Sequence, residues 1–502
     1  MLVHRSRGLS PVRIRNCGRA GVTVFAWCQY CCPDEGADRG RPVPEESAVG
    51  LVPTFMWFSA EWCSSPPEEL LSAEIAILNK EAVALAADGS VTLMSGPAEN
   101  PHQVFTSANK IFRLPGTHTV SFMIYNNAGF MGIPWEPVIT RFGESVGPSP
   151  LPYLAEYAGR FLGFLKNERE LITAAIEEQY FTSMIYTCYL SFRQVFRESA
   201  SEMIRDRGVI SEDQIGDFVA EKINNAYTLI TSNKTVPGIG PDFIKELSKA
   251  WDATTTRAMS EIFEQLPIPE PARVQLKEIP FLLFGRFAGD LDPAYQNFSG
   301  IVIAGFGEKE VFPSLVSYAI DGRLAGTLKY RELGIKTISL RDSAYVIPFA
   351  EREMVDIFMS SIDPRLTDAL VTSLSEIFHE YPPAIIDSIE TMSEEEKTNL
   401  KTQFEPKSDE LAARISTYLE NYRASNTAPL ISAVATLPKQ ELAAMAESLV
   451  NLASLKRKVS SPAGATGGPV DVALISKRDG FVWIRKKEYF DPDINPQVIQ
   501  RY

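Results

Sequence analysis

Strand-like and helix-like segments occur in separate blocks along this chain of 502 residues. Short apolar runs bounded by turn residues predict strands within residues 74–125, 298–355 and 470–485. Apolar residues at helical spacing predict helices within residues 151–282 and 356–459. Because the helices are grouped and do not alternate one by one with strands, this order predicts an α+β fold. It argues against a doubly wound parallel sheet.

Turn and capping residues refine this prediction. Residues 79–81 form a turn between two apolar strands, and Asp321-Gly322 is a hairpin signal. Ser211 and Ser393 each begin a sequence typical of a helix capping box. The basic residues 456–458 follow an amphipathic segment, so we interpret them as charges that complement the end of a helix dipole.

The first 71 residues differ from the rest of the chain. They hold five of the six Cys and no Lys, and they show no lasting period of 2 or 3.6. Three interpretations remain open: a disordered leader, a propeptide, or a mis-assigned start, of which the last two are favoured. The remaining residues contain a single Cys, Cys188, on an apolar stretch, where we expect a core residue. This usage of Cys predicts a reducing, cytoplasmic compartment.

Composition excludes several classes of function. The net charge of −14 argues against nucleic acid as a partner, because phosphate binding needs a basic face. No run of 18 apolar residues occurs, so a membrane-spanning helix is not expected. Only four His are present, and the one close Cys cluster lacks a second pair. We therefore predict no metal and no cofactor.

The first hairpin carries a resemblance to a known family. Residues 74–88 resemble the opening of proteasome β-type subunits and their bacterial relatives, in which a nucleophilic Thr starts a strand and an Ala-Ala-Asp ends the next one. Residues 109–114 are similar to the family's Lys-bearing strand, residues 303–322 to its middle hairpin, and residues 467–481 to its last strand pair. The resemblance implies an N-terminal-nucleophile hydrolase fold, in which two stacked antiparallel sheets lie between helical layers in a four-layer αββα sandwich.

The resemblance also implies a division of the chain. We expect a leader, three parts of the sandwich and two helical insertions: residues 1–71 as the leader, 72–150 as the first half of the sandwich, 151–295 as a helical insertion, 296–355 as the middle strands, 356–459 as a helical segment or insertion, and 460–502 as the last strand pair and tail.

In this family the base is the α-amine of the nucleophilic residue, which must therefore be the first residue of the mature chain. A nearby Lys ammonium lowers the pKa of that amine, and an Asp orients the Lys. Carried over, Asp88 aligns with the orienting Asp and Lys110 with the Lys, and counting back from Asp88 gives Ser72 as the nucleophile. Reading Leu71 as an initiator Met that is later removed would expose the amine of Ser72.

Further site residues are expected around this group. The resemblance implies a backbone oxyanion donor near Asn126 or Asn127. Thr466, beside Gly467, stands where the family has a late Ser. Residues 346–350 occupy the place of the loop that carries the family's supporting Ser, and they contain none.

Two functions from different classes remain open. One is a hydrolase of peptide or other amide bonds that attacks through Ser72, with small amides as a weaker substrate option. The other is a catalytically inactive scaffold or ring subunit that binds protein partners. Either could form a homo-oligomer. Taken alone, Asp88 could merely cap a hairpin, and Lys110 could be a surface residue on an edge strand.

Overall fold

A computed structural model describes the chain in several ranges: residues 72–94, 102–105, 107–208, 211–291, 298–460, 468–488 and 495. The expected leader, residues 1–71, lies outside the described residues, as do Thr466 and Gly467. No helix within the described ranges has the length and apolar character needed to cross a membrane.

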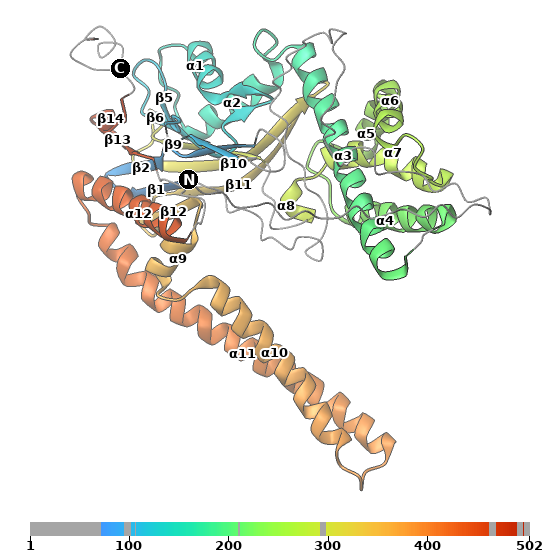
Figure 1. The fold of residues 1–502 in the computed structure, drawn as a ribbon. Coiled ribbons are helices and arrows are strands. Elements are labelled where there is room, and N and C mark those ends of the chain that lie inside the picture. Colours follow the sequence, from blue (N-terminus) through green and yellow to red (C-terminus); the bar gives the residue numbers. More distant parts are fainter. Residues whose placement is uncertain are drawn as a thin grey trace, which may run out of the picture. The chain divides into compact units, whose positions relative to one another are not determined.

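Two five-stranded antiparallel sheets form the centre of the described chain (Figure 1). The first sheet has the strand order β12 (Ala344–Ala350), β1 (Ala73–Asn79), β2 (Ala82–Asp88), β13 (Val470–Ser476) and β14 (Gly480–Arg485). The second has the order β11 (Thr327–Thr337), β10 (Ser314–Leu324), β9 (Ser299–Gly305), β6 (Val120–Asn126) and β5 (Ile111–Arg113). Two small hairpins complete the strands: β3 (Val91–Met94) with β4 (His102–Phe105), and β7 (Gly129–Phe130) with β8 (Ile133–Pro134).

The largely apolar character of β1 and β2 between their polar ends follows from burial on both faces. Ala76 and Leu78 of β1 belong to a hydrophobic cluster that also contains side chains of the second sheet. Ile75 and Ile77, which alternate with them, belong to another cluster that contains helical residues. A strand that is covered on both sides has no polar face, so its sequence does not alternate.

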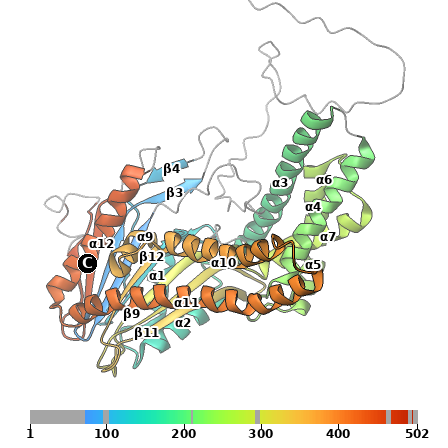
Figure 2. The same ribbon diagram turned by 90° about the horizontal axis from the view of Figure 1, so that it is seen from below.

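Twelve helices occur within the described ranges. The first sheet is covered by α9 (Glu353–Ser360) and α12 (Lys439–Ser460), which share its cluster. The second sheet shares a larger cluster with the helices between β8 and β9. These are α1 (Trp135–Val146), α2 (Leu154–Asn167), α3 (Ala174–Arg207), α4 (Glu212–Ser232), α5 (Pro241–Ala250), α6 (Asp252–Phe263), α7 (Glu270–Phe284) and α8 (Ala288–Leu291). The remaining two, α10 (Pro364–Asp387) and α11 (Glu394–Val434), run side by side (Figures 1 and 2).

The structure confirms the coarse fold class and several local predictions. The chain is a mixed α+β protein with antiparallel sheets. Both predicted capping boxes are present, at Ser211 before α4 and at Ser393 before α11. Cys188 is buried in α3, as expected of a core residue.

Two local predictions were wrong. Asp321-Gly322 is not a turn, because β10 continues to Leu324 and the chain reverses at Ala325 and Gly326. Gly322 lies inside the strand, where an added Cβ would come within 2.5 Å of the Tyr180 ring, so this Gly permits close packing. Residues 346–350 are not a loop: they belong to β12, which pairs with β1 along its whole length.

Candidate active site

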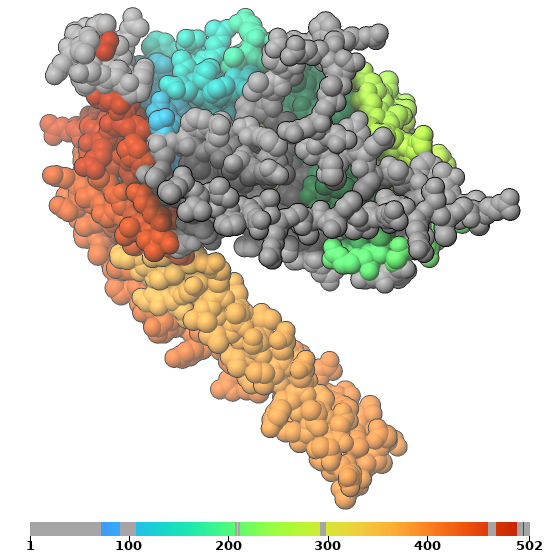
Figure 3. Space-filling model, in the orientation of Figure 1, coloured from blue at the N-terminus to red at the C-terminus, as the bar shows by residue number. Residues whose placement is uncertain are grey.

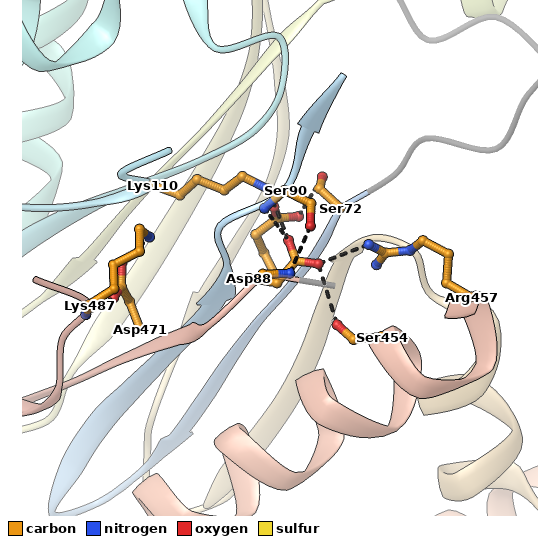
Figure 4. A network of polar contacts seen from close by, with 10 residues as sticks. Ser72, Asp88, Ser90, Lys110, Ser454, Arg457, Asp471 and Lys487 are labelled. Carbon is orange, nitrogen blue, oxygen red and sulfur yellow. Dashed lines mark hydrogen bonds and ion pairs between the residues drawn. The ribbon is translucent and has the colours of Figure 1, made fainter. Parts of the chain in front are cut away.

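The three residues expected to form the site lie at neighbouring strand ends. Ser72 directly precedes β1, Asp88 is the last residue of β2, and Lys110 directly precedes β5 of the second sheet. The backbone carbonyl of Ser72 accepts a hydrogen bond from the Glu351 amide at 3.2 Å, which continues the pairing of β1 with β12. Because β1 and β2 form an antiparallel hairpin, the start of one lies beside the end of the other (Figure 4).

Lys110 connects the two sheets through ion pairs. Its ammonium nitrogen lies 3.2 Å from Asp88 Oδ1 and 2.7 Å from an oxygen of Glu74. The side chain of Lys110 is 3% exposed, and those of both carboxylates are 0% exposed. Lys110 is therefore not a surface residue, although β5 is an edge strand of the second sheet. Asp88 also accepts a weak hydrogen bond from the Ser90 amide at 3.4 Å, so it does cap the hairpin end as well.

Glu74 is the member of the site that the sequence analysis did not select. The Ser72 hydroxyl donates to Glu74 Oε2 at 3.3 Å, while Lys110 binds Glu74 Oε1. Ser72 and Glu74 are two positions apart in an extended chain, so their side chains point to the same side of it. That i, i+2 spacing is the sequence signal for Glu74, but the apolar residues 75–78 that follow it are equally typical of an ordinary buried strand. Burial raises the pKa of Glu74 to about 7, although the Lys110 charge acts in the opposite direction.

Asp88 has partners on α12 as well. Its Oδ2 atom lies 2.9 Å from an Arg457 guanidinium nitrogen and accepts a hydrogen bond from the Ser454 hydroxyl at 3.3 Å (Figure 4). Burial acts to raise the pKa of Asp88, but the charges of Lys110 and Arg457 outweigh it and hold that pKa below its ordinary value. Interpreting Arg457 only as a charge at a helix end was therefore incomplete, because it is a buried partner of the site.

The expected oxyanion donors are arranged differently from the prediction. The backbone amide of Asn127 donates to the Phe298 carbonyl at 3.4 Å, so it is already engaged. Asn126 has a left-handed backbone with φ of 60°, and its side-chain amide is buried without a hydrogen-bond partner among the described residues. Burial, followed by the negative charge of Glu74, raises the pKa of the neighbouring Tyr125, so this strand end lies within electrostatic reach of the site.

The remaining two candidates come directly before Gly468, where the described chain resumes. Thr466 and Gly467 lie outside the described residues, but Gly468 donates from its amide to the Ser90 hydroxyl at 3.1 Å. The chain therefore returns to the end of β2 at this point. Within the described ranges, no group of three His, Cys, Asp or Glu side chains is arranged to hold a metal ion.

No family model matches the chain, and no curated protein is significantly similar to it. Two buried carboxylates, an ammonium and a guanidinium form a network whose formal charges can balance. Two hydroxyls donate to this network: that of Ser72 to Glu74, and that of Ser454 on α12 to Asp88. Such a group offers a nucleophile, a nearby proton acceptor and a cation that can stabilise developing negative charge.

A second buried Lys–Asp pair lies close to the site and provides a comparison. Asp471 of β13 forms an ion pair with Lys487, and its other oxygen accepts a hydrogen bond from the Lys487 amide at 2.7 Å (Figure 4). The Lys487 side chain is 9% exposed and that of Asp471 is 3% exposed. Within the described chain, no hydrogen bond or ion pair joins this pair to Ser72 or Glu74, so it serves as a control for Lys110.

Proposed function

We propose that this chain is an N-terminal-nucleophile hydrolase that cleaves peptide or other amide bonds through Ser72. The observation that carries the proposal is the Ser72 hydroxyl on a buried Glu74 carboxylate whose other oxygen binds Lys110. The position of Asp88 on the same Lys agrees with the role that the family resemblance implies for it. Perturbed, buried titratable groups of this kind are typical of active sites, although ion-pair networks also occur for structural reasons.

The arrangement of the sheets supports the finer fold assignment that this proposal needs. One hydrophobic cluster draws side chains from both sheets, and two others join the outer faces of the sheets to helices. This layering supports the proposal of a four-layer αββα sandwich. The proposed nucleophile directly precedes β1, and the family resemblance implies a nucleophile at the start of a strand.

The proposed reaction proceeds through an acyl ester. Ser72 Oγ attacks the carbonyl carbon of the amide, and its hydroxyl proton passes to the free α-amine of Ser72. The C–N bond of the substrate breaks, and the leaving nitrogen takes that proton. Water then hydrolyses the ester and restores the hydroxyl. The ammonium of Lys110 favours the neutral, basic form of the amine, whereas an ionised Glu74 opposes it.

The first experiment determines the N-terminal residue of the protein produced from its own gene, by intact mass and terminal sequencing. We expect a chain that begins at Ser72 and that reacts once with an acylating probe such as a β-lactone. Ser72→Ala should abolish this labelling without unfolding the protein. A chain that retains the residues before Ser72, with no labelling, contradicts the proposed chemistry.

A pair of Lys variants tests whether the network serves chemistry. Lys110→Met should reduce the labelling rate by at least a hundredfold, because the Ser72 amine loses its neighbouring cation. Lys487→Met removes a largely buried Lys from another Lys–Asp ion pair and should leave labelling within a few-fold of the unchanged protein. Equal loss of labelling in both variants would indicate a general effect on the fold.

A second candidate function is an inactive scaffold or ring subunit that binds protein partners. The observation that favours it is the number of structural contacts of Asp88, which joins α12 to both sheets through Arg457 and Lys110. The absence of a Ser in β12, where the family has its supporting Ser, points the same way. For a scaffold, Ser72→Ala changes no reaction, and Lys110→Met affects only stability.

A further inference from the structure

The helical hairpin of α10 and α11 carries an unusual number of exposed apolar side chains. In the space-filling view these two helices pack against each other as one unit (Figure 3). Nine large apolar residues on them are between 39% and 69% exposed. They are Leu366, Leu370, Ile377, Tyr381 and Ile385 on α10, and Phe404, Leu411, Tyr418 and Tyr422 on α11.

Helical spacing places the exposed apolar residues of both helices on one side of the hairpin. On the other side His379 of α10 forms a pair with Asp409 of α11 at 3.0 Å. The line of contact between the two helices is here called the seam, and Phe378 lies on it because its carbonyl contacts α11. Ile377 and His379, one residue before and one after Phe378, therefore point to opposite sides of the seam. Leu411 and Asp409 likewise fall on opposite sides of the seam. The nine residues therefore form one surface, here called the apolar face.

The apolar face is large enough to form an interface. Nine side chains of this size and exposure offer on the order of 100 Å² each, or roughly 900 Å² together. The largest exposed apolar patch on a typical monomer is about 300–600 Å². A standard stable interface buries about 800 Å² on each partner. The exposed area of the apolar face thus exceeds that of the largest apolar patch on a typical monomer, and it matches the area that one partner buries in a stable dimer interface.

The charges beside the apolar face suit a second copy of the same hairpin. Exposed Glu380 lies on the outer edge of α10, and exposed Lys407 lies at the edge of α11. The Ser408 hydroxyl donates to the Phe378 carbonyl at 2.6 Å, so these residues are level with each other along the hairpin. Counting from them, Glu380 and Lys407 lie within about one residue rise, roughly 1.5 Å, of the same level.

We propose that this protein forms a dimer in which two hairpins pack through their apolar faces into a four-helix bundle. A twofold axis along the hairpin places α10 of one copy opposite α11 of the other at the same level. This arrangement pairs Glu380 of each copy with Lys407 of its partner at the rim, and it closes the apolar residues of both copies into one core. Because acidic residues outnumber basic ones on these helices, an anionic membrane surface or a nucleic acid is a poor occupant.

The experiment measures the mass of the full chain in solution by analytical ultracentrifugation. We expect the mass of two chains at about 50 µM. Ile377→Glu and Tyr418→Glu each place a charge in the apolar face and should weaken association at least tenfold. Thr372→Glu and Ala413→Glu add the same charge at exposed positions on the side of the His379–Asp409 pair, and they should leave the dimer intact.

A charge exchange tests the proposed orientation. Glu380→Lys and Lys407→Glu should each weaken the dimer several-fold, because each places like charges together at the rim. The two changes in one chain restore opposite charges and should recover most of the lost affinity. Circular dichroism establishes that each variant keeps its helices.

Three results would overturn the proposal. One is a chain that remains monomeric at about 100 µM, which would leave the apolar face to a different partner. Another is a dimer that persists in both Ile377→Glu and Tyr418→Glu, which would place the contact on another surface. The third is an exchanged-charge variant no tighter than the single variants, which would exclude the side-by-side orientation.

Discussion

Glu74 is the residue on which the electrostatics of the site depend. It is 2% exposed, it binds Lys110, and it accepts the hydrogen bond of the Ser72 hydroxyl. A carboxyl group in this position can carry a proton near neutral pH, since its pKa is raised to about 7. We therefore expect the charge next to Ser72 to change near neutral pH, with consequences for stability and for the proposed reactivity of Ser72.

The first prediction concerns stability. In the folded chain Glu74 retains its proton up to about pH 7, whereas its ordinary pKa is 4.5. The folded state thus binds more protons than the unfolded state in this window, and the free energy of unfolding falls as the pH rises through it. Glu74→Gln should remove about 1 to 3 kcal/mol of this fall, measured by urea unfolding at pH 4.5 and pH 8. Glu81→Gln, at an exposed position of the same hairpin, should change nothing.

The second prediction concerns reactivity and rests on the proposed function. An ionised Glu74 raises the pKa of an amine beside it, because opposite charges stabilise the protonated amine. Glu74→Gln should therefore shift the rise of Ser72 labelling with pH to lower pH by about one unit. The measurement is the rate of acylation between pH 5 and pH 9. If labelling is lost at every pH while the protein stays folded, Glu74 itself accepts the hydroxyl proton, and the amine does not.

Sequence reasoning identified part of this site and missed the rest for physical reasons. Ser72, Asp88 and Lys110 were selected through the order of family-like segments, and the structure brings them together around Glu74. Glu74 and Arg457 were missed because their roles depend on burial. A Glu at the start of an apolar strand, or an Arg near a helix end, is usually solvated, and only packing reveals that these two are not.

At the scale of elements, α12 holds the end of β2 through charge as well as packing. Its apolar residues Leu442, Ala446 and Val450 belong to the cluster beneath the first sheet. Near the C-terminal end of the same helix, Arg457 is 5% exposed and forms an ion pair with Asp88. Buried charges of this kind are costly unless each has its partner, so the contact ties the position of the helix to the site.

The third prediction follows from this contact. Arg457→Leu leaves Asp88 with Lys110 as its one remaining ion-pair partner among the described contacts. It should lower the free energy of unfolding by about 2 to 4 kcal/mol, measured by chemical denaturation with circular dichroism. Lys458→Leu, one residue away and exposed, is the matched control and should stay within about 0.5 kcal/mol. A loss of the same size in both variants would mean that helix-end charge is the cause.

The elements themselves were predictable where their signals are local. The capping boxes before α4 and α11 and the hairpin of β1 and β2 depend on neighbouring residues, and all three are present. Asp321-Gly322 has the composition of a turn but lies within β10. There Asp321 forms an ion pair at 2.6 Å with Lys329 of the neighbouring strand β11. A contact across the strand pair overrides the turn preference there, and no local pattern contains that information.

At the scale of the whole molecule, the hairpin of α10 and α11 is separable from the hydrophobic cores. None of the described residues in the three hydrophobic clusters lies between Met359 and Leu430. The base of the hairpin is nevertheless anchored, because Asn426 donates to the Ser360 carbonyl at 3.0 Å and Thr427 donates to the Met359 carbonyl at 3.2 Å. The sheets and their covering helices should therefore fold without the outer part of the hairpin.

The fourth prediction tests this separation. Residues 366 and 420 are level with each other when counted from the Ser408–Phe378 contact, so a linker of a few Gly and Ser residues can replace the segment between them. The shortened chain should unfold cooperatively, with a midpoint within about 5 °C of the full chain, measured by calorimetry. It should keep its Ser72 labelling and sediment as a monomer. If the cooperative transition disappears instead, the hairpin contributes to the core, and its exposed apolar residues would need a structural explanation within the single chain.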